Sequence, residues 1–327
     1  MDLTVTVAVY NEEESLPHLC SKLHEVLSQM GRTYEVILVD DGSKDRSWEV
    51  MCEQAEKLPH FKLIRFRRNF GQTAAISAGF RESQGEVVVT LDADLQNDPA
   101  DIPLLLERME QGNFDVVSGW RKDRQDRFIN RRLPSVIANW LIGRMTDVRL
   151  HDYGCSLKAY RCEIVKSVRL YGEMHRFIPA LAHWVGGTID EMPVRHHARR
   201  YGQSKYGISR TLRVVLDLLT VKFLLTYSTR PIQVFGRFGM AFFGFAAAIL
   251  AVLGLDRLTG PWWSEVYLLK RPFWVITPLM FLGFALQFMV MGLLGELMTR
   301  TYHESQDKPI YSVREVLTSS EIQANKR

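Results

Sequence analysis

The first 120 residues alternate short apolar runs with longer segments in which apolar residues recur at helical spacing. Five runs rich in β-branched residues predict strands, and the segments between them predict helices. Strands that alternate with helices are typical of an α/β domain, in which helices cover a mostly parallel sheet. The predicted strands are 4–10, 34–40, 61–66, 86–92 and 114–120, and the predicted helices are 13–30, 44–58, 73–83 and 100–111.

Polar residues, most of them acidic, stand at the carboxyl ends of three of the predicted strands. In an open α/β sheet the ligand binds beyond the carboxyl ends of the strands. We therefore expect these strand ends to face one crevice. The three segments are Tyr-Asn-Glu at 10–12, Asp-Asp at 40–41 and Asp-Ala-Asp at 92–94.

The strand at 86–92 ends in two carboxylates on either side of Ala93. Side chains two apart in a strand point to the same face, so Asp92 and Asp94 are expected to converge on one cation. One or two carboxylates together with substrate phosphates hold Mg²⁺ in many proteins, and such a cation neutralises a departing diphosphate. A solvated turn is the common alternative for this short motif. Its place after an apolar strand, level with two other acidic strand ends, favours a site for Mg²⁺ or Mn²⁺.

Basic residues are concentrated in two short segments, although the formal net charge of the whole chain is only +4. So small a balance does not predict a nucleic-acid-binding protein. Residues 121–132 include six basic and two acidic side chains, and residues 195–213 include six basic and no acidic ones. Arg binds phosphate through two parallel hydrogen bonds, and anionic headgroups attract basic segments. A solvated loop explains many such runs, but we expect one or two of these residues to hold a lipid phosphate.

Two segments near the C-terminus, 238–255 and 272–295, contain no Asp, Glu, Lys or Arg. Their lengths match the hydrocarbon core of a bilayer. The loop between them carries Trp262, Trp263 and Tyr267, a cluster typical of the membrane interface. Two buried core helices are the alternative, but the pattern favours a transmembrane hairpin.

The orientation of this hairpin is not decided by charge, because the loop at 256–271 and the 20 residues after the second segment each carry three basic residues. The N-terminus lacks the basic start and apolar run of a signal peptide. The four cysteines have no metal-binding or disulfide spacing, which fits a reducing compartment. We therefore expect an inner-membrane protein with both termini in the cytosol.

Two further segments have the amphipathic pattern of helices that lie on a membrane surface. The longer one falls within 206–232, next to the hairpin, and the shorter one within 131–146. Ordinary core helices are the alternative, above all for the shorter segment. Its apolar face comprises Leu133, Val136, Ile137, Trp140 and Leu141.

Seven motifs, spread in order over nearly the whole chain, resemble those of the polyprenyl-phosphate glycosyltransferases. These enzymes are family-2 glycosyltransferases of the GT-A fold, and they include dolichyl-phosphate mannose synthase and bacterial enzymes that load undecaprenyl phosphate. The later motifs are most similar to the branch that transfers 4-deoxy-4-formamido-L-arabinose. The motifs are VAVYNEEESL, VDDGSKDRS, RNFGQTAAISAGF, LDADLQNDP, DYGCSLKAYR, RFIPALA and YGQSKYG.

The resemblance implies a Rossmann-like GT-A domain that binds a nucleotide-sugar at the strand ends. By this resemblance, Asp92, Asp94 and Gln96 hold the metal ion and the diphosphate. The chain departs from the family at Ala8, where proline is common, so the following turn is expected to be less rigid. The implied nucleotide-binding residues are Ala8, Tyr10, Asn11, Glu12, Asp40, Asp41, Asp92 and Ala93.

The same resemblance assigns residues to the acceptor and to catalysis. Asp94 and Asp152 are the implied catalytic residues, and Asp152 stands where the family has its base. A phosphate monoester already carries roughly 1.5 to 2 negative charges at neutral pH, so Asp152 either orients the acceptor or accepts its last proton. The implied phosphate and acceptor contacts are Arg121, Arg127, Arg200, Ser204 and Lys205.

Together these features predict a glycosyltransferase that inverts the anomeric carbon. A phosphate oxygen of undecaprenyl phosphate attacks a nucleotide-sugar, which the bacterial branch suggests is UDP-linked, and the product serves cell-envelope glycan modification. Transfer from GDP-mannose and a non-catalytic membrane scaffold of the same fold are the alternatives. A processive polysaccharide synthase is disfavoured because the chain has no Q-x-x-R-W motif.

The predicted organisation has four parts. A cytosolic GT-A domain spans 1–205, and an interfacial region spans 206–232 with a contribution from 131–146. The transmembrane hairpin spans 233–298, and a cytosolic tail spans 299–327. Relatives make a homo-oligomer, such as a tetramer, the expected assembly.

Overall fold

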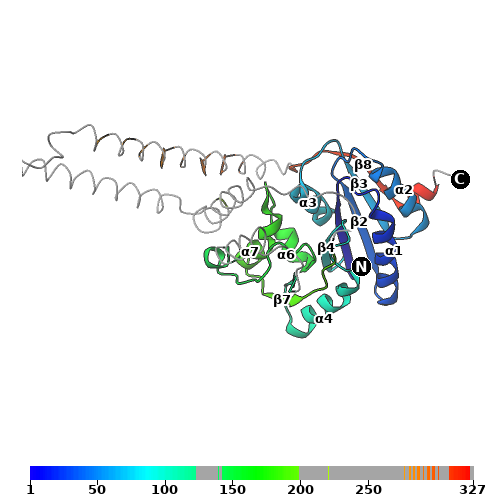
Figure 1. Cartoon of the computed structure of the whole chain (residues 1–327), viewed down its shortest axis with the longest axis horizontal. Coiled ribbons are helices and arrows are strands. Elements are labelled where there is room, and N and C mark those ends of the chain that lie inside the picture. Colours follow the sequence, from blue (N-terminus) through cyan, green and yellow to red (C-terminus); the bar gives the residue numbers. More distant parts are fainter. Residues whose placement is uncertain are drawn as a thin grey trace, which may run out of the picture. The chain divides into compact units, whose positions relative to one another are not determined.

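The computed structural model describes residues 1–122, 142–198 and 309–324, together with single positions at 139, at 220 and between 276 and 301. The chain divides into two compact units, one formed by Met1–Val221 with Lys308–Arg327 and the other by Lys222–Asp307. Nearly all described residues belong to the first unit, whose helices and strands are labelled in Figure 1.

A mixed sheet forms the centre of the first unit. The order of its strands is β7-β5-β6-β4-β1-β2-β3-β8. The pairs β1–β2, β1–β4, β2–β3 and β5–β7 are parallel, whereas β6 and β8 run antiparallel to their neighbours. The predicted α/β class with a mostly parallel sheet is therefore confirmed. The strands are β1 (Leu3–Val9), β2 (Tyr34–Asp40), β3 (Phe61–Phe66), β4 (Val87–Asp92), β5 (Val116–Trp120), β6 (Lys158–Arg161), β7 (Ile189–Pro193) and β8 (Val313–Thr318).

Helices cover both faces of this sheet, with α1 and α2 on the side opposite to α3 (Figure 1). The four predicted helices are present, and the fourth is preceded by a 3-10 turn. Sequence patterns did not predict the short elements after β6. The elements are α1 (Leu16–Gln29), α2 (Ser47–Lys57), α3 (Gln72–Glu82), η1 (Pro99–Asp101), α4 (Ile102–Gly112), α6 (Cys162–Ser167), η3 (Met174–Phe177), α7 (Ile178–Trp184) and α12 (Ser319–Ala324).

Strand β2 shows why a continuous apolar run lies at the centre of the fold. Successive side chains of a strand point to opposite faces, and both faces of β2 are covered. Val36 and Leu38 pack in the core that includes residues of α1, α2 and α4, while Ile37 and Val39 pack against α3. A strand buried on both faces has no polar alternation, which is the pattern of parallel sheets.

Helix α3 approaches β1 so closely that one of its positions has no room for a side chain. A Cβ atom on Gly79 would lie 2.0 Å from Cγ2 of Thr6 on β1. The neighbouring Ala74, Ala75 and Ala78 are also small and buried. The small residues of the GQTAAISAGF segment thus set the depth at which α3 sits on the sheet, and its N-terminus is placed beside the end of β4.

The C-terminal segment returns to the first unit and extends its sheet. Strand β8 pairs with β3, and the Ser319 hydroxyl donates to the Leu58 carbonyl at 3.0 Å. The ring of Tyr311 stacks on Phe66 with 4.9 Å between centroids. Residues 313–324, which lie within the predicted tail 299–327, belong to the first unit, in which β8 pairs with the outer edge of β3.

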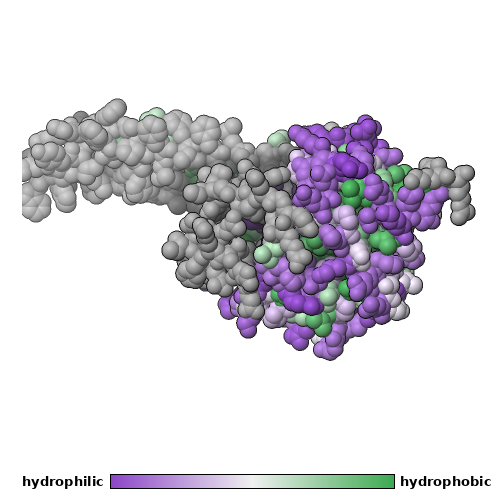
Figure 2. All heavy atoms as spheres, turned by 45° about the vertical axis from the view of Figure 1, so that its right-hand side comes forward, coloured by the Kyte–Doolittle hydropathy of each residue, from purple (hydrophilic) through white to green (hydrophobic). Residues whose placement is uncertain are grey.

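The predicted membrane segments fall almost entirely outside the described residues. Within the part that the structure describes, no helix is both long and apolar enough to cross a bilayer. The predicted span 238–255 has no described residue, and only single positions of 272–295 and of the interfacial region 206–232 are described. On the face of the first unit seen in Figure 2, hydrophobic residues of the described part are scattered among hydrophilic ones.

The packing of β8 predicts a stability difference between two residues of the C-terminal segment. Tyr311→Ala should destabilise the first unit by about 3 kcal/mol, because it removes a buried ring from its contact with Phe66. Val316→Ala on β8 is the control, since Val316 is 43% exposed and should cost under about 1 kcal/mol. The unfolding midpoint, followed by tryptophan fluorescence, measures both. A Tyr311→Ala midpoint equal to that of the wild type would contradict a stabilising role for this contact.

Candidate active site

The carboxyl ends of three adjacent strands bring the predicted acidic segments together. Strand β1 lies between β4 and β2, and its last residues pair in register with both neighbours. Ala8 is the partner of Asp92, and Val9 is the partner of Asp40. The three polar strand ends therefore lie side by side, as the parallel pattern predicts.

Hydrogen bonds join the loop after β1 to the loop after β2. Asn11 has a left-handed backbone with φ of 56°, and its amide donates to the Ser43 hydroxyl at 3.0 Å. Its side-chain oxygen accepts from the Lys44 amide at 2.8 Å. The Glu12 amide donates to the Ser47 hydroxyl at 2.8 Å. Asn11 and Glu12, both predicted to bind nucleotide, thus also fix the shape of the two loops.

Asp41 shapes a third loop, the one that leads into α3. Its two carboxylate oxygens accept from the backbone amides of Phe70 (2.7 Å) and Gly71 (2.9 Å). Burial raises the pKa of Asp41 to about 6. Next to it, Gly42 has φ of +68°, and a Cβ there would lie 2.4 Å from the Arg68 carbonyl carbon. The Asp-Asp-Gly sequence is therefore required for the close approach of these loops.

Asp40 is completely buried beneath the loops. Its Oδ1 accepts from the Ser43 amide at 2.9 Å, and its Oδ2 lies 3.6 Å from Nε of Arg65. Burial raises the pKa of Asp40 above its ordinary value. In this conformation the carboxylate supports the loop from inside and offers no surface to a ligand.

Asp92 and Asp94 lie close together, but not for the reason that the strand pattern suggested. Strand β4 ends at Asp92, and Asp94 lies in a turn in which Leu95 has a positive φ of 58°. Alternation along a strand therefore does not apply to Asp94, and that argument was wrong. Burial, and then the negative charge of Asp94, raise the pKa of Asp92 above its ordinary value.

Each of these two carboxylates accepts a hydrogen bond from a glutamine side chain. Gln72, the first residue of α3, donates from Nε2 to Asp92 Oδ1 at 2.7 Å. Gln96 donates from Nε2 to Asp94 Oδ2 at 2.5 Å, and its backbone amide donates to Oδ1 at 3.2 Å. The two neutral donors orient the carboxylates without cancelling their charge.

This pair of oriented carboxylates suits a hard divalent cation that arrives with phosphate ligands. No group of three or more His, Cys, Asp or Glu side chains arranged to hold a metal occurs among the described residues. A protein cage of that kind is not needed for Mg²⁺, which binds one or two carboxylates and completes its shell with waters and substrate phosphates. The oxygen donors present therefore fit the predicted metal.

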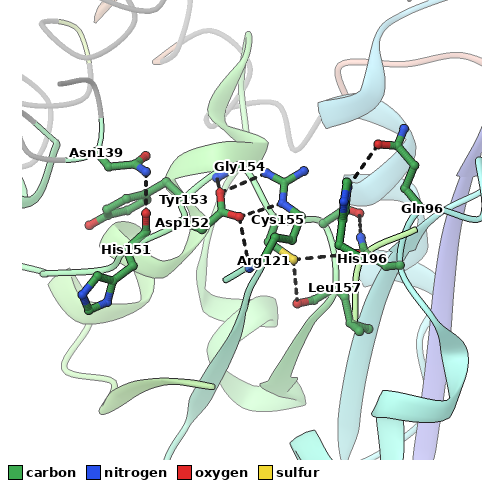
Figure 3. Close-up of polar contacts among 12 residues, drawn as sticks. Gln96, Arg121, Asn139, His151, Asp152, Tyr153, Gly154, Cys155, Leu157 and His196 are labelled. Carbon is green, nitrogen blue, oxygen red and sulfur yellow. Dashed lines mark hydrogen bonds and ion pairs between the residues drawn. The ribbon is translucent and has the colours of Figure 1, made fainter. Parts of the chain in front are cut away.

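Asp152 and Arg121 form a buried, bidentate ion pair (Figure 3). Arg121 donates from Nε to Asp152 Oδ2 at 2.6 Å and from Nη2 to Oδ1 at 2.9 Å. The Gly154 amide also donates to Oδ1, at 3.1 Å. Burial lowers the pKa of Arg121, but the hydrogen bonds and charge of Asp152 outweigh this effect and hold it above its usual value.

This pairing bears on the roles that were predicted for both residues. A carboxylate with both oxygens on a guanidinium is a weak proton acceptor, because protonation would break the ion pair. The geometry therefore favours an orienting role for Asp152 over that of a base. Arg121 was predicted as a phosphate contact, and in the structure its guanidinium group donates two hydrogen bonds to Asp152. Nothing in the local sequence indicated that residues 31 positions apart would pair.

A cavity of about 60 Å³, a volume suited to a few water molecules, is lined in part by Asp92. Lys158 on β6 is buried in its wall and donates to the backbone carbonyls of Tyr153 (3.2 Å) and Cys155. Burial lowers the pKa of Lys158. His175 also lines the cavity. Its Nδ1 lies 2.9 Å from the Thr73 hydroxyl, and burial lowers the pKa of His175 to about 3.

Sequence reasoning assigned no role to Gln72, Lys158 or His175, which are among the polar residues that line this cavity. A lysine within an apolar strand segment is a signal that could have identified Lys158. Gln72 and His175 gave no comparable signal. Of the predicted phosphate contacts, Arg127, Arg200, Ser204 and Lys205 lie outside the described residues.

Residues 4–169 match the sequence profile of the family described as Glycosyl transferase family 2. The chain belongs to this family. It is 43% identical over 324 residues to a dodecaprenyl-phosphate galacturonate synthase of Rhizobium johnstonii, and the match covers 97% of this chain and 93% of that protein. The resemblance inferred from the motifs is therefore confirmed.

A second relative agrees with this assignment, and a solved structure shares the fold. The chain is 39% identical to an undecaprenyl-phosphate 4-deoxy-4-formamido-L-arabinose transferase of Edwardsiella ictaluri, over 98% of this chain and 95% of that protein. The fold of this chain is similar to that of a glucosyl-3-phosphoglycerate synthase from Mycobacterium tuberculosis, which was crystallised with Mn²⁺ and UDP-glucose. That match has a TM-score of 0.52 at 15% identity and covers 68% of this chain and 78% of the other.

The Arg121–Asp152 pair predicts non-additive losses of stability. Asp152→Asn should cost about 3 kcal/mol, because it leaves a buried guanidinium without its carboxylate. The double variant Arg121→Gln, Asp152→Asn should lose about 1 to 3 kcal/mol less than the sum of the two single losses. Urea unfolding of the wild type, both single variants and the double variant measures this coupling. Strictly additive losses would contradict the pairing.

The buried imidazole of His175 predicts a dependence of stability on pH. Below about pH 6.5 the unfolded chain protonates this side chain, whereas the folded protein keeps it neutral down to about pH 3. The free energy of unfolding should therefore fall as the pH is lowered through this window, by up to about 1.4 kcal/mol per pH unit. His175→Gln should reduce that slope, while His183→Gln, at an exposed position, should keep it. Urea titrations between pH 4 and 7 test this, and an unchanged slope in His175→Gln would contradict it.

Proposed function

We propose that this glycosyltransferase moves a sugar from a UDP-sugar to undecaprenyl phosphate at the cytosolic face of the inner membrane, with inversion at the anomeric carbon. The observation that carries the proposal is the adjacent pair Asp92 and Asp94 at the sheet edge, in a family-2 chain whose relatives are named for transfer to polyprenyl phosphates. The family alone supports sugar transfer, and the relatives support the lipid acceptor.

The proposed reaction is a direct displacement. An oxygen of the lipid phosphate forms a bond to the anomeric carbon from the face opposite to the diphosphate, and the bond from that carbon to the diphosphate oxygen breaks. Asp92 and Asp94 would hold a divalent cation, Mg²⁺ or Mn²⁺, which supplies positive charge to the departing diphosphate. Gln72 and Gln96 keep the two carboxylates in place for this task.

Little proton transfer is required of the protein, because the phosphate monoester is mostly ionised at neutral pH. Asp152 therefore acts through position. Its ion pair with Arg121 fixes the segment 152–156 against the end of β5. By family position, Arg127, Arg200, Ser204 and Lys205 contact the acceptor or donor phosphates, and residues 10–12 with Asp41 form the nucleotide site.

The proposed membrane arrangement follows from the sequence. Residues 233–298 form a transmembrane hairpin, and the basic, amphipathic segments at 131–146 and 206–232 lie on the membrane surface. Both termini are cytosolic. The charge-free segments 238–255 and 272–295 support this arrangement, as does a lipid acceptor that is confined to the bilayer. We further propose a homo-oligomer.

Two sugars are the first candidates for the donor, because the relatives are named for them. A uronic acid and 4-deoxy-4-formamido-L-arabinose carry different polar groups, and the names of the relatives support both. GDP-mannose represents the alternative donor class. A non-catalytic scaffold is disfavoured because the carboxylate pair and its glutamine donors are all present.

The test incubates membranes that contain the protein with undecaprenyl phosphate, Mg²⁺ and one of four donors: UDP-galacturonate, UDP-4-deoxy-4-formamido-L-arabinose, UDP-glucose and GDP-mannose. Mass spectrometry of the lipids should show one donor-dependent glycosyl phosphate product. EDTA and Asp92→Asn should each reduce its formation at least about 100-fold, because the diphosphate loses its counter-charge. Absence of product with every donor, or full activity of Asp92→Asn, would contradict the proposal.

A further inference from the structure

The cavity that Asp92 lines carries more positive than negative charge. Burial raises the pKa of two phenols and a thiol in its wall and lowers the pKa of an imidazole, so these groups are uncharged near neutral pH. They belong to Tyr153, Cys155, Tyr160 and His175. The charged groups in the wall are Asp92, Lys158 and Arg176. Among the described residues that line the cavity, two cations therefore face one anion.

Lys158 carries a buried charge whose hydrogen bonds go to neutral groups. Its residue is only 3% exposed, and its ammonium group donates to the backbone carbonyls of Tyr153 and Cys155. An ammonium group has three N–H donors, so one donor remains for a group inside the cavity. A buried charge is costly unless an opposite charge accompanies it. A negative group in the cavity would supply that charge.

Asp92 connects this cavity to the cation site of the proposed function. Its carboxylate lies in the wall of the cavity, and a divalent cation held there would balance its charge. The diphosphate of the donor is a ligand of such a cation, and the sugar is bonded directly to the diphosphate. The sugar must therefore lie near the cavity. Once the cation has balanced Asp92, the positive charges of Lys158 and Arg176 remain without a counter-charge in the cavity wall.

We propose that Lys158 and Arg176 form a subsite for the carboxylate of a uronic acid donor. Arg binds a carboxylate through two parallel hydrogen bonds, and Lys contributes a compact positive charge. The carboxylate takes the place of the few waters for which the cavity has room, while the sugar ring stays outside. The inference rests on the proposed function and narrows it, because galacturonic acid is the one sugar considered there that carries a negative group on its ring.

The subsite predicts discrimination between two donors that differ in a single group. UDP-galactose has a neutral hydroxymethyl group where UDP-galacturonate has its carboxylate. A hydrogen bond to a charged group is stronger than one between neutral groups, so the wild type should bind UDP-galacturonate at least about 10-fold more tightly than UDP-galactose.

The test measures the binding of UDP-galacturonate, UDP-galactose and UDP to the purified full-length protein by calorimetry, with Mn²⁺ and without the lipid acceptor. Lys158→Met removes the charge and keeps the length of the side chain. It should weaken binding of UDP-galacturonate about 10-fold and leave the affinities for UDP-galactose and UDP within about 2-fold. Lys158→Arg should keep most of the preference. Arg176→Gln should also lose the preference, and it replaces Lys158→Met if that variant does not fold.

Lys166 on α6 provides a matched control. Its ammonium group also donates to two backbone carbonyls, those of Arg81 and Ser83, both at 3.0 Å. It is not among the residues that line the cavity. Lys166→Met should therefore keep the preference for UDP-galacturonate. If Lys158 served only to hold backbone carbonyls, Lys158→Met would instead weaken the binding of both UDP-sugars to the same extent.

Three results would overturn the inference. The first is equal affinity of the wild type for the two UDP-sugars. The second is an equal loss for both sugars in Lys158→Met, which would reduce Lys158 to a support of the segment 152–156. The third is an unchanged preference in Lys158→Met and Arg176→Gln together with a raised KM for undecaprenyl phosphate, which would assign the cavity to the acceptor phosphate. Failure of the wild type to bind UDP or either UDP-sugar with Mn²⁺ would remove the proposed function as well, and no variant is needed to observe it.

Discussion

The structure depends on the compensation of negative charge at one edge of the sheet. Parallel pairing of β1 with both β2 and β4 places their last residues side by side, so the acidic strand ends lie close together. Each carboxylate is stabilised differently. Asp41 accepts backbone amides, Asp152 pairs with a guanidinium, and Asp92 and Asp94 accept from neutral glutamines. The last two keep most of their charge available, and they are the two to which the proposed function assigns the cation.

The residues that shape this sheet edge follow one another along the chain, from the loop after β3 into helix α3. The loop after β3 is drawn to the sheet by Asp41 and by the absence of a side chain at Gly42. Helix α3 then begins at Gln72, at the correct place to reach Asp92. Gly79 allows the helix to lie close to β1, which keeps Gln72 within hydrogen-bonding distance. The close packing at Gly79 and the hydrogen bond from Gln72 therefore both help to position the Asp92 carboxylate.

Much of the fold could be predicted because its signals are local. The apolar run of β2 and the polar strand ends follow from side-chain alternation and from parallel topology. Strand β8 could not be predicted, because its charged residues alternate weakly with apolar ones and its partner β3 is some 250 positions earlier in the chain. The Arg121–Asp152 pair could not be predicted either, because its two residues lie 31 positions apart in the chain. Asp94 was placed near Asp92 correctly but by an argument that fails, since the strand ends at Asp92 and a turn brings the second carboxylate back.

The return of β8 to the sheet has a consequence for how the two units are connected. Because residues on both sides of Lys222–Asp307 belong to the sheet-containing unit, the second unit is an insertion and not an appendage. Two polypeptide crossings instead of one join it to the domain that carries the carboxylates. A protease cut in one crossing would therefore leave the two units covalently attached through the other.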